Sequence, residues 1–144
     1  MAARHKARKR ALDILYAAEM RGESPVLALE RAIADGDAPH NPYTAVLVRG
    51  VATHAGEIDA LLRERSRGWT LERMPAIDRN VLRIGTYEIL FADDVPAAVA
   101  VSEAVVLVKE LSTDESPAFV NGLLDAIATN PSVTTPTGDS ALHD

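Results

Sequence analysis

The sequence contains no cysteine among its 144 residues. This absence excludes disulfide bonds and thiolate zinc sites, and it is compatible with a reducing cytoplasm, where we expect the protein to reside. No apolar run approaches the roughly 18 residues that a membrane-spanning helix needs, so we expect no membrane association. The basic N-terminus is not followed by the apolar stretch of a secretory signal, which we therefore exclude.

Residues suited to catalysis or metal binding are also sparse. The four histidines (His5, His40, His54 and His143) are scattered along the chain. None has the sequence neighbours expected of a nucleophile's base or of a metal-ligand set. We interpret His54, which lies on an apolar stripe, as a packed and hydrogen-bonded residue. We therefore predict a protein that is not an enzyme and that has no metal and no cofactor.

Charge is distributed unevenly along the chain. Residues 1–10 carry five Lys or Arg and no acid, a net charge of +5, whereas the other 134 residues carry 10 Lys or Arg and 21 Asp or Glu, a net charge of −11. Cations at the start of a helix oppose its dipole, so their placement there indicates another use. Polyanion binding is one such use, and a solvated, disordered terminus is the alternative.

Apolar residues recur at helical spacing through most of the chain, and no segment has the alternation of a strand. We predict a first helix that ends near Arg21, with the basic residues as its free or fraying first turns. Two further helices are predicted from Pro25 to about Ile33 and from Tyr43 to about Arg67. These are followed by a short helical turn over residues 69–74. Three more helices are predicted: one at 76–91, one that ends at about Leu111, and one from Pro117 to Asn130. The predicted fold is all-α, with six to seven helices and no sheet.

The predicted domain spans residues 1–131, with a basic arm at 1–10 and a disordered tail at 132–144 that is rich in Thr, Ser, Pro and Gly. The first three and last three helices form natural three-helix sub-bundles. Trp69, the only tryptophan, is expected to seal the junction between these halves.

The segment Ala76–Phe91 is apolar around most of its circumference, which is typical of a buried central helix. Gly85 would weaken it unless another helix crosses closely there. Glu88 falls on the apolar arc, so we expect it to be buried and hydrogen-bonded rather than catalytic. In the last helix, Asn121 and Gly122 are poor helix formers. We expect Gly122 to allow close helix contact and Asn121 to bond to backbone inside the fold.

Several spaced blocks resemble the NusB family of bacterial transcription antitermination factors. The basic arm leads into Ala11–Tyr16, and the further blocks are Asp78–Leu90, Asp94–Pro96, Val99–Val105 with Lys109, and Phe119–Asp125. Each block alone is a weak signal, but their order is specific, and together they cover residues 4 to about 128.

The resemblance implies an all-helical protein that performs no reaction. Its implied partners are a small-subunit ribosomal protein that doubles as NusE, single-stranded boxA RNA in ribosomal RNA leaders, other Nus factors and RNA polymerase. Family members differ in oligomeric state, and an exposed apolar helix face could pair two copies as a homodimer.

The resemblance also implies a set of RNA-facing residues. They are Arg4, His5, Lys6, Arg8, Lys9, Arg10, Tyr16, Glu115 and Phe119. Asp78, at the expected exposed start of the central helix, matches a position near the NusE side. Lys and Arg would contact phosphates, and the rings of Tyr16 and Phe119 could stack on bases. For both rings, helix packing is the alternative interpretation, and for Glu115 and Asp78 it is a helix-terminus charge.

Two other functional interpretations remain. NusB-like domains also precede ribosomal RNA cytosine methyltransferases, but that enzyme needs a Gly-rich cofactor loop and a nucleophilic cysteine, which are absent here, so the chain could only be an accessory RNA-binding domain of that kind. The other alternative is a protein–protein adaptor without a nucleic-acid role.

Overall fold

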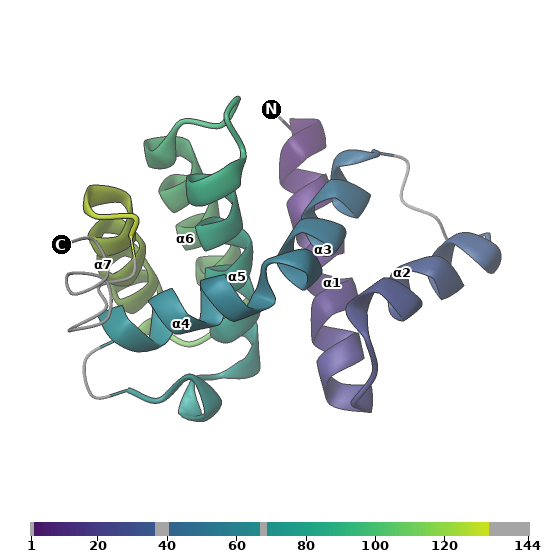
Figure 1. Cartoon of the computed structure of the whole chain (residues 1–144), viewed down its shortest axis with the longest axis horizontal. Helices are drawn as coiled ribbons and strands as arrows, with labels where there is room; N and C mark the ends of the chain where they lie inside the picture. The colour runs from purple at the N-terminus through teal and green to yellow at the C-terminus, as the bar shows by residue number, and fades with distance from the viewer. Residues whose placement is uncertain (1, 37–40, 67–68, 133–144) are drawn as a thin grey trace, which may run out of the picture.

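The computed structural model describes residues 2–36, 41–66 and 69–132. These ranges form seven α-helices and one short 3₁₀ helix, without any strand, so the all-α prediction is confirmed (Figure 1). The elements are α1 Ala2–Arg21, α2 Pro25–Ala34, α3 Tyr43–Thr53, α4 Ala55–Arg65, η1 Leu71–Arg73, α5 Ala76–Phe91, α6 Ala97–Leu111 and α7 Ser116–Thr129. The predictions about His40, His143 and the tail beyond Ser132 fall outside the described ranges.

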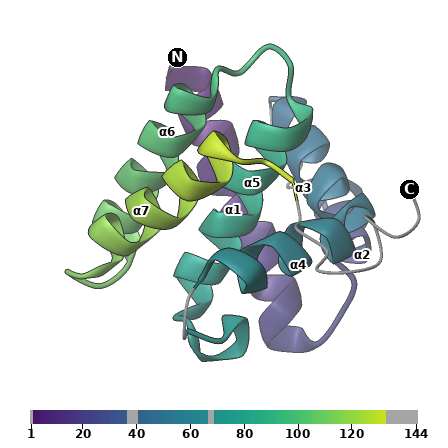
Figure 2. The same ribbon diagram turned by 60° about the vertical axis from the view of Figure 1, so that its left-hand side comes forward.

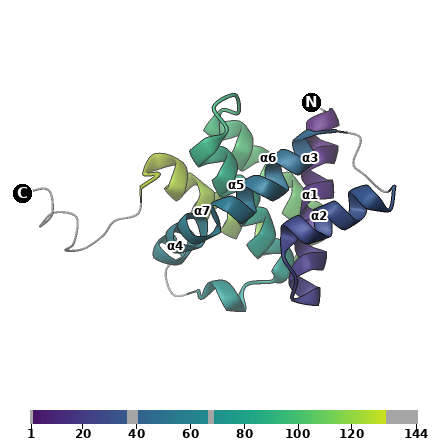
Figure 3. The same ribbon diagram turned by 45° about the vertical axis from the view of Figure 1, so that its right-hand side comes forward.

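The helices form the two groups that the sequence predicts. Helices α1, α2 and α3 pack on one another, and Figure 3 shows α2 and α3 on the near side of α1. Helices α5, α6 and α7 form the second group, with α4 packed against α5 and α7. Helix α5 also contacts α1 and α3, so it belongs to the core of both groups.

The N-terminal basic segment is not a fraying arm. It is the first half of α1, which is helical from Ala2 and buries an apolar stripe (Ala7, Ala11, Leu12, Leu15 and Ala18). The start of α3 holds these first turns, because Asn41 donates to the carbonyl of Ala3 at 3.2 Å and Thr44 donates to that of Ala7 at 3.1 Å. The expectation of free first turns is therefore wrong.

Two turn signals place α2 after α1. Gly22 has a φ of 67°, which ends α1 in the left-handed conformation that glycine adopts without strain. The amide of Glu23 donates to the carbonyl of Ala18 at 2.9 Å, as in a Schellman motif. The Ser24 hydroxyl then accepts from the amide of Val26 at 3.2 Å, and Pro25 occupies the first helical position.

The predicted single helix from Tyr43 to about Arg67 is wrong. It divides into α3 and α4 at His54, whose φ of −106° and ψ of 21° leave the helical region. The His54 ring stacks on Phe91 of α5, with centroids 3.8 Å apart, and lies 3.1 Å from Glu57. This confirms the interpretation of His54 as a packed residue. The break directs α3 toward α1 and α4 toward α7.

The two glycines expected at helix contacts differ in their surroundings. A Cβ at Gly85 would lie 2.8 Å from Leu124 Cδ1 and 3.6 Å from Ala104 Cβ, which confirms a close crossing of α5 with α7 and α6. A Cβ at Gly122 would have no neighbour within 4 Å, so the expected contact there is wrong. Asn121 is exposed and lies 3.4 Å from Asp125, so its predicted bond inside the fold is also wrong. Both residues lie on the outer face of α7, where packing does not restrict residue type.

A buried ion pair joins α1, α3 and α5. Glu88 of α5 is 1% exposed, as predicted. Arg8 of α1 is 4% exposed and donates from Nε to both carboxylate oxygens of Glu88 at 3.0 Å. Tyr43 of α3 donates its hydroxyl to the same carboxylate. Burial raises the pKa of the Tyr43 phenol, and the hydrogen bond to Glu88 raises it further, so the phenol keeps its proton.

Replacing Glu88 by alanine leaves the Arg8 guanidinium buried without its carboxylate. We expect Glu88→Ala to lower the free energy of unfolding by about 3–5 kcal/mol, the usual cost of breaking a buried pair. Urea unfolding followed by circular dichroism measures this. As the control, Glu23→Ala removes a carboxylate that pairs with the exposed Arg31 and should change stability little. An unchanged unfolding midpoint for Glu88→Ala would contradict the role of this cluster.

The same alanine substitution should have opposite effects at the two glycines. Gly85→Ala forces a methyl group into Leu124 and should destabilise the protein. Gly122→Ala adds a methyl group in open space on a helix and should stabilise it by up to about 1 kcal/mol. Thermal unfolding of both variants compares them directly. Equal effects would show that the α5–α7 contact does not depend on Gly85.

Candidate nucleic-acid interface

The cations of α1 divide into buried and outward-facing residues. Lys6 is exposed, and the side chain of Lys9 is 46% exposed. Arg4 is half-buried, with its guanidinium 4.2 Å from the centre of the Tyr43 ring, and Arg10 is also half-buried. Arg8 points the other way, into the pair with Glu88. The structure therefore does not support a phosphate contact from Arg8, because burial removes it from the surface.

Acidic side chains face Arg4, His5 and Lys9. Arg4 pairs with Asp94 at 2.7 Å, and this hydrogen bond lowers the pKa of the Asp94 carboxyl. The His5 ring lies between two glutamates of α6, 3.2 Å from Glu103 and 3.3 Å from Glu110. Lys9 lies 3.8 Å from Glu110. Lys6 has no ion pair within the described part of the chain.

Tyr16 continues the outward-facing side of α1. It is 37% exposed, so its ring is available to a ligand. It follows Lys9 by seven residues, which is close to two helical turns, so the two residues share a side of the helix. The structure thus brings exposed cations and an exposed ring together on one preformed surface, which we call the α1 surface and define by Lys6, Lys9 and Tyr16.

The other predicted ring lies at the start of α7. Phe119 is half-buried, and its centroid lies 5.9 Å from that of Trp69. Trp69 is 56% exposed, so the expectation that it seals the junction of the two halves is wrong. Instead the two rings line an open groove of about 590 Å³, together with Met74, Pro75 and the exposed Glu115. Sequence reasoning missed this groove because a lone tryptophan more often fills a core.

Asp78 lies at the floor of that groove and is not exposed. It is 2% exposed and accepts hydrogen bonds from Ser112 at 2.6 Å and Ser116 at 2.8 Å. These bonds fasten the α6–α7 connection over the first turn of α5. The expectation of an exposed carboxylate available to a protein partner is therefore wrong, and the alternative of a structural charge at a helix start is the better interpretation.

Helix α6 separates the α1 surface from the Phe119 groove. Its Glu103 and Glu110 pair with α1, and α6 also packs along α7 (Figure 2). The structure therefore places the predicted RNA-facing residues in two neighbouring sets. The set on α1 combines charge and an aromatic ring, whereas the set around Phe119 is apolar with acidic Glu115 at its edge.

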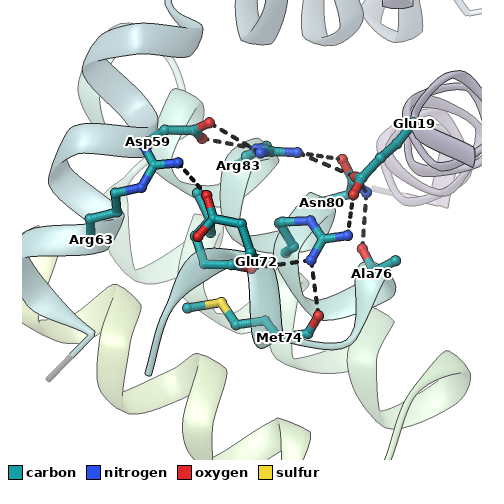
Figure 4. Close-up of polar contacts among 10 residues, drawn as sticks. Glu19, Asp59, Arg63, Glu72, Met74, Ala76, Asn80 and Arg83 are labelled. Atoms are coloured by element: carbon teal, nitrogen blue, oxygen red, sulfur yellow. Dashed lines mark hydrogen bonds and ion pairs between the residues drawn. The ribbon is translucent and has the colours of Figure 1, made fainter. Parts of the chain in front are cut away.

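A polar network that the sequence did not predict joins α1, α4 and α5 (Figure 4). Glu19 of α1 accepts hydrogen bonds from Arg79 and from Asn80, the latter at 2.8 Å. Arg83 forms a two-point pair with Asp59 of α4 at 2.9 and 3.1 Å. The spacing of Arg79 and Arg83 on one side of α5 signals a shared polar face, but their partners lie 60 and 24 positions away.

Glu19 is ionised in this network. Partial burial acts to raise the pKa of its carboxyl, but the hydrogen bonds from Arg79 and Asn80 and the nearby positive charges outweigh that effect. The pKa of Glu19 is therefore lowered from its ordinary value of 4.5. The pairing fixes the C-terminal half of α1, as the Glu88 cluster fixes its N-terminal half.

Neither a metal site nor a membrane-spanning segment is found in the described ranges. They contain no group of three or more His, Asp or Glu side chains arranged to hold a metal ion. Within them, no helix combines the length and the apolar character needed to cross a bilayer.

Comparison with known proteins assigns the chain to a family. The model of the NusB family matches residues 5–129. The chain is 65% identical over 130 residues to the transcription antitermination protein NusB of a Nocardioides species, with 90% of this chain and 96% of the relative covered. It is 55% identical over 124 residues to the protein of the same name from Thermobifida fusca, with 86% and 87% covered.

The chain belongs to the NusB family. This confirms the resemblance that the ordered blocks of sequence indicate, and it makes the chain a member of a family of transcription antitermination factors.

Solved structures of NusB proteins share the fold. A crystal structure of T. maritima NusB matches with a TM-score of 0.80 and 34% identity, over 91% of this chain and 93% of that one. The NusB fold also matches a chain in a crystal structure of the antitermination factors NusB and NusE with double-stranded RNA, with a TM-score of 0.77 and 28% identity over 90% of this chain and 98% of that one.

The Glu19 network makes stability depend on pH. Because the pKa of Glu19 is lower in the folded protein, its stabilising contribution is complete above the unfolded value and is lost as pH falls through the folded value. We expect Glu19→Gln to be less stable than the parent at pH 7, and the difference to shrink progressively below about pH 4.5. Urea unfolding at several pH values between 7 and 3 measures it, and a difference independent of pH would contradict the assignment.

Proposed function

We propose that this NusB-family protein acts as an RNA-binding antitermination factor, with a NusE-like ribosomal protein as its partner and boxA-type single-stranded RNA as its ligand. Through the other Nus factors, the complex would modify RNA polymerase against termination. The protein would work in the cytoplasm and perform no reaction itself. The family assignment supports the general role, and the α1 surface supports the RNA ligand.

The observation that carries the proposal is the α1 surface. Lys6 and Lys9 project from a helix that the body of the protein already holds in place. Phosphates attract such cations without regard to base sequence, so these residues supply affinity and position rather than specificity. A preformed helix also loses less conformational entropy on binding than a disordered arm would.

Rings next to the cations would supply base contacts. Tyr16 is partly exposed on the α1 surface, and the half-buried Phe119 lines the groove beside the exposed Trp69. Unstacked bases of single-stranded RNA bind such rings, and each stacked base contributes about 1–3 kcal/mol. Tyr16 is the stronger candidate of the two predicted rings because Phe119 is packed against the core.

The protein partner requires a surface other than the Asp78 carboxylate. A solved NusB structure contains NusE, which supports a protein contact on this fold. We propose that the exposed rim of the Trp69 groove takes part, because Trp69 and Pro75 expose apolar surface in the same groove as Asp78. A second copy of the chain is the alternative occupant of exposed apolar surface, and a protein–protein adaptor without RNA is the alternative function.

Removing the exposed lysines should weaken RNA binding without regard to sequence. We expect Lys6→Ala/Lys9→Ala to bind boxA RNA and a scrambled RNA of equal composition more weakly by similar factors. Removing one lysine–phosphate interaction should reduce the magnitude of the log–log salt slope by about 0.7, so the double variant should reduce it by about 1.4. Salt titrations of both RNAs, with the NusE-like partner present, measure this. The charge-matched control, Arg21→Ala/Arg31→Ala, alters the opposite end of α1 and α2 and should leave the slope unchanged.

Tyr16→Ala tests the specific part of the interface. We expect it to weaken boxA RNA more than scrambled RNA and to leave the salt slope nearly intact, because the ring contacts bases rather than phosphates. Both RNAs are titrated as above, after circular dichroism has shown that the variant is folded. An equal loss for the two RNAs would remove Tyr16 from base recognition. If neither Tyr16→Ala nor the lysine variant affects RNA, the adaptor function is favoured.

A further inference from the structure

The pairing of the α1 surface with α6 has no evident structural need. Lys9 and Glu110 are 46% and 42% exposed, and their charges lie 3.8 Å apart. Exposed pairs of this kind contribute little to stability because water and salt screen them. Helix α1 is already held by the buried Arg8–Glu88 pair and by the Glu19 network. The acids of α6 are therefore better considered for their effect on the RNA that is proposed to bind the α1 surface.

Glu110 is placed to engage two groups of α1 together. Its Oε1 lies 3.3 Å from His5 Nε2, and its Oε2 lies 3.8 Å from Lys9 Nζ. Glu103 engages the other side of His5 and lies 3.5 Å from Arg8 Nη1. The carboxylates of α6 thus lie against His5 and Lys9, two of the side chains that are predicted to face RNA.

We propose that Glu110, assisted by Glu103, limits the RNA affinity of the protein by competing with phosphate for the cations of α1. This inference rests on the proposed RNA-binding function. A phosphate that approaches Lys9 must displace Glu110, and the released carboxylate then remains beside the phosphate and repels it. The competition acts on phosphates, so it weakens the binding of every RNA alike.

As a consequence, an RNA must make more favourable contacts in order to bind stably. An RNA that offers only phosphates meets a Lys9 whose charge Glu110 already partly neutralises, and it binds more weakly. An RNA that also stacks bases on Tyr16 gains free energy that the α6 acids do not oppose. Glu110 and Glu103 therefore leave the ratio of specific to non-specific affinity unchanged. They raise the RNA concentration that non-specific binding requires, so that at lower concentrations only the specific RNA is bound.

The test is a nearly isosteric substitution that removes the negative charge of Glu110. We expect Glu110→Gln to bind scrambled and boxA RNA more tightly by similar factors, about two- to fivefold at low salt, as an exposed ion pair would permit. The gain should shrink near 0.15 M salt because screening weakens both the pair and the repulsion. The matched control is Glu57→Gln, which removes an exposed glutamate that also pairs with a histidine, but on α4. The control should leave both affinities unchanged.

A double-mutant cycle separates competition from a general effect of net charge. In a Lys9→Ala background, the gain from Glu110→Gln should fall, because the cation for which phosphate and carboxylate compete is absent. An equal gain with and without Lys9, or no gain at all from Glu110→Gln at low salt, would overturn the inference. If neither Lys6→Ala/Lys9→Ala nor Tyr16→Ala changes RNA binding, the proposed function itself fails, so the two failures are distinguishable.

Discussion

The carboxylate of Glu88 lies on the buried inner face of α5, and the groups that neutralise it come from other helices. Arg8 reaches it from α1 and Tyr43 reaches it from α3. A buried carboxylate is unfavourable unless such partners are present, so these helices must pack in the one arrangement that supplies them. The rotation of α1 about its own axis follows from this. With Arg8 directed inward, Lys6, Lys9 and Tyr16 are directed outward.

This constraint divides the basic segment between two roles. Arginine suits the buried role, because its planar group donates to both carboxylate oxygens at once, whereas lysine is a compact point charge that suits exposed phosphate contacts. The segment also has to be helical despite cations that oppose the helix dipole. The bonds from Asn41 and Thr44 offset that unfavourable placement. The ligand surface is therefore part of the folded body and its charge is partly neutralised before any ligand arrives.

The sequence predicts the elements of the fold better than their partners. Helical periodicity identifies the helices, and the isolated acid on the apolar arc of α5 indicates that Glu88 is buried. Periodicity describes only one helix at a time, however, so it could not reveal that Arg8 is the partner 80 positions away. The same limit explains the wrong predictions for Trp69 and Asp78, because the exposure of each depends on residues of α7 and of the α6–α7 connection that are distant in sequence. The break at His54 coincides with the stacking of its ring on Phe91, a contact that local sequence does not encode.

Hydrogen exchange of the backbone amides of Lys6 to Arg10 tests most directly whether the Glu88 cluster preforms the α1 surface. These amides follow the first turn of α1, so in a preformed helix they are hydrogen-bonded and protected. We predict that they are protected in the free protein, that RNA adds little further protection, and that Glu88→Ala removes the protection in this segment before the rest of α1. Rapid exchange of these amides in the free protein, with protection only after RNA is added, would contradict the account and indicate an arm that folds on its ligand.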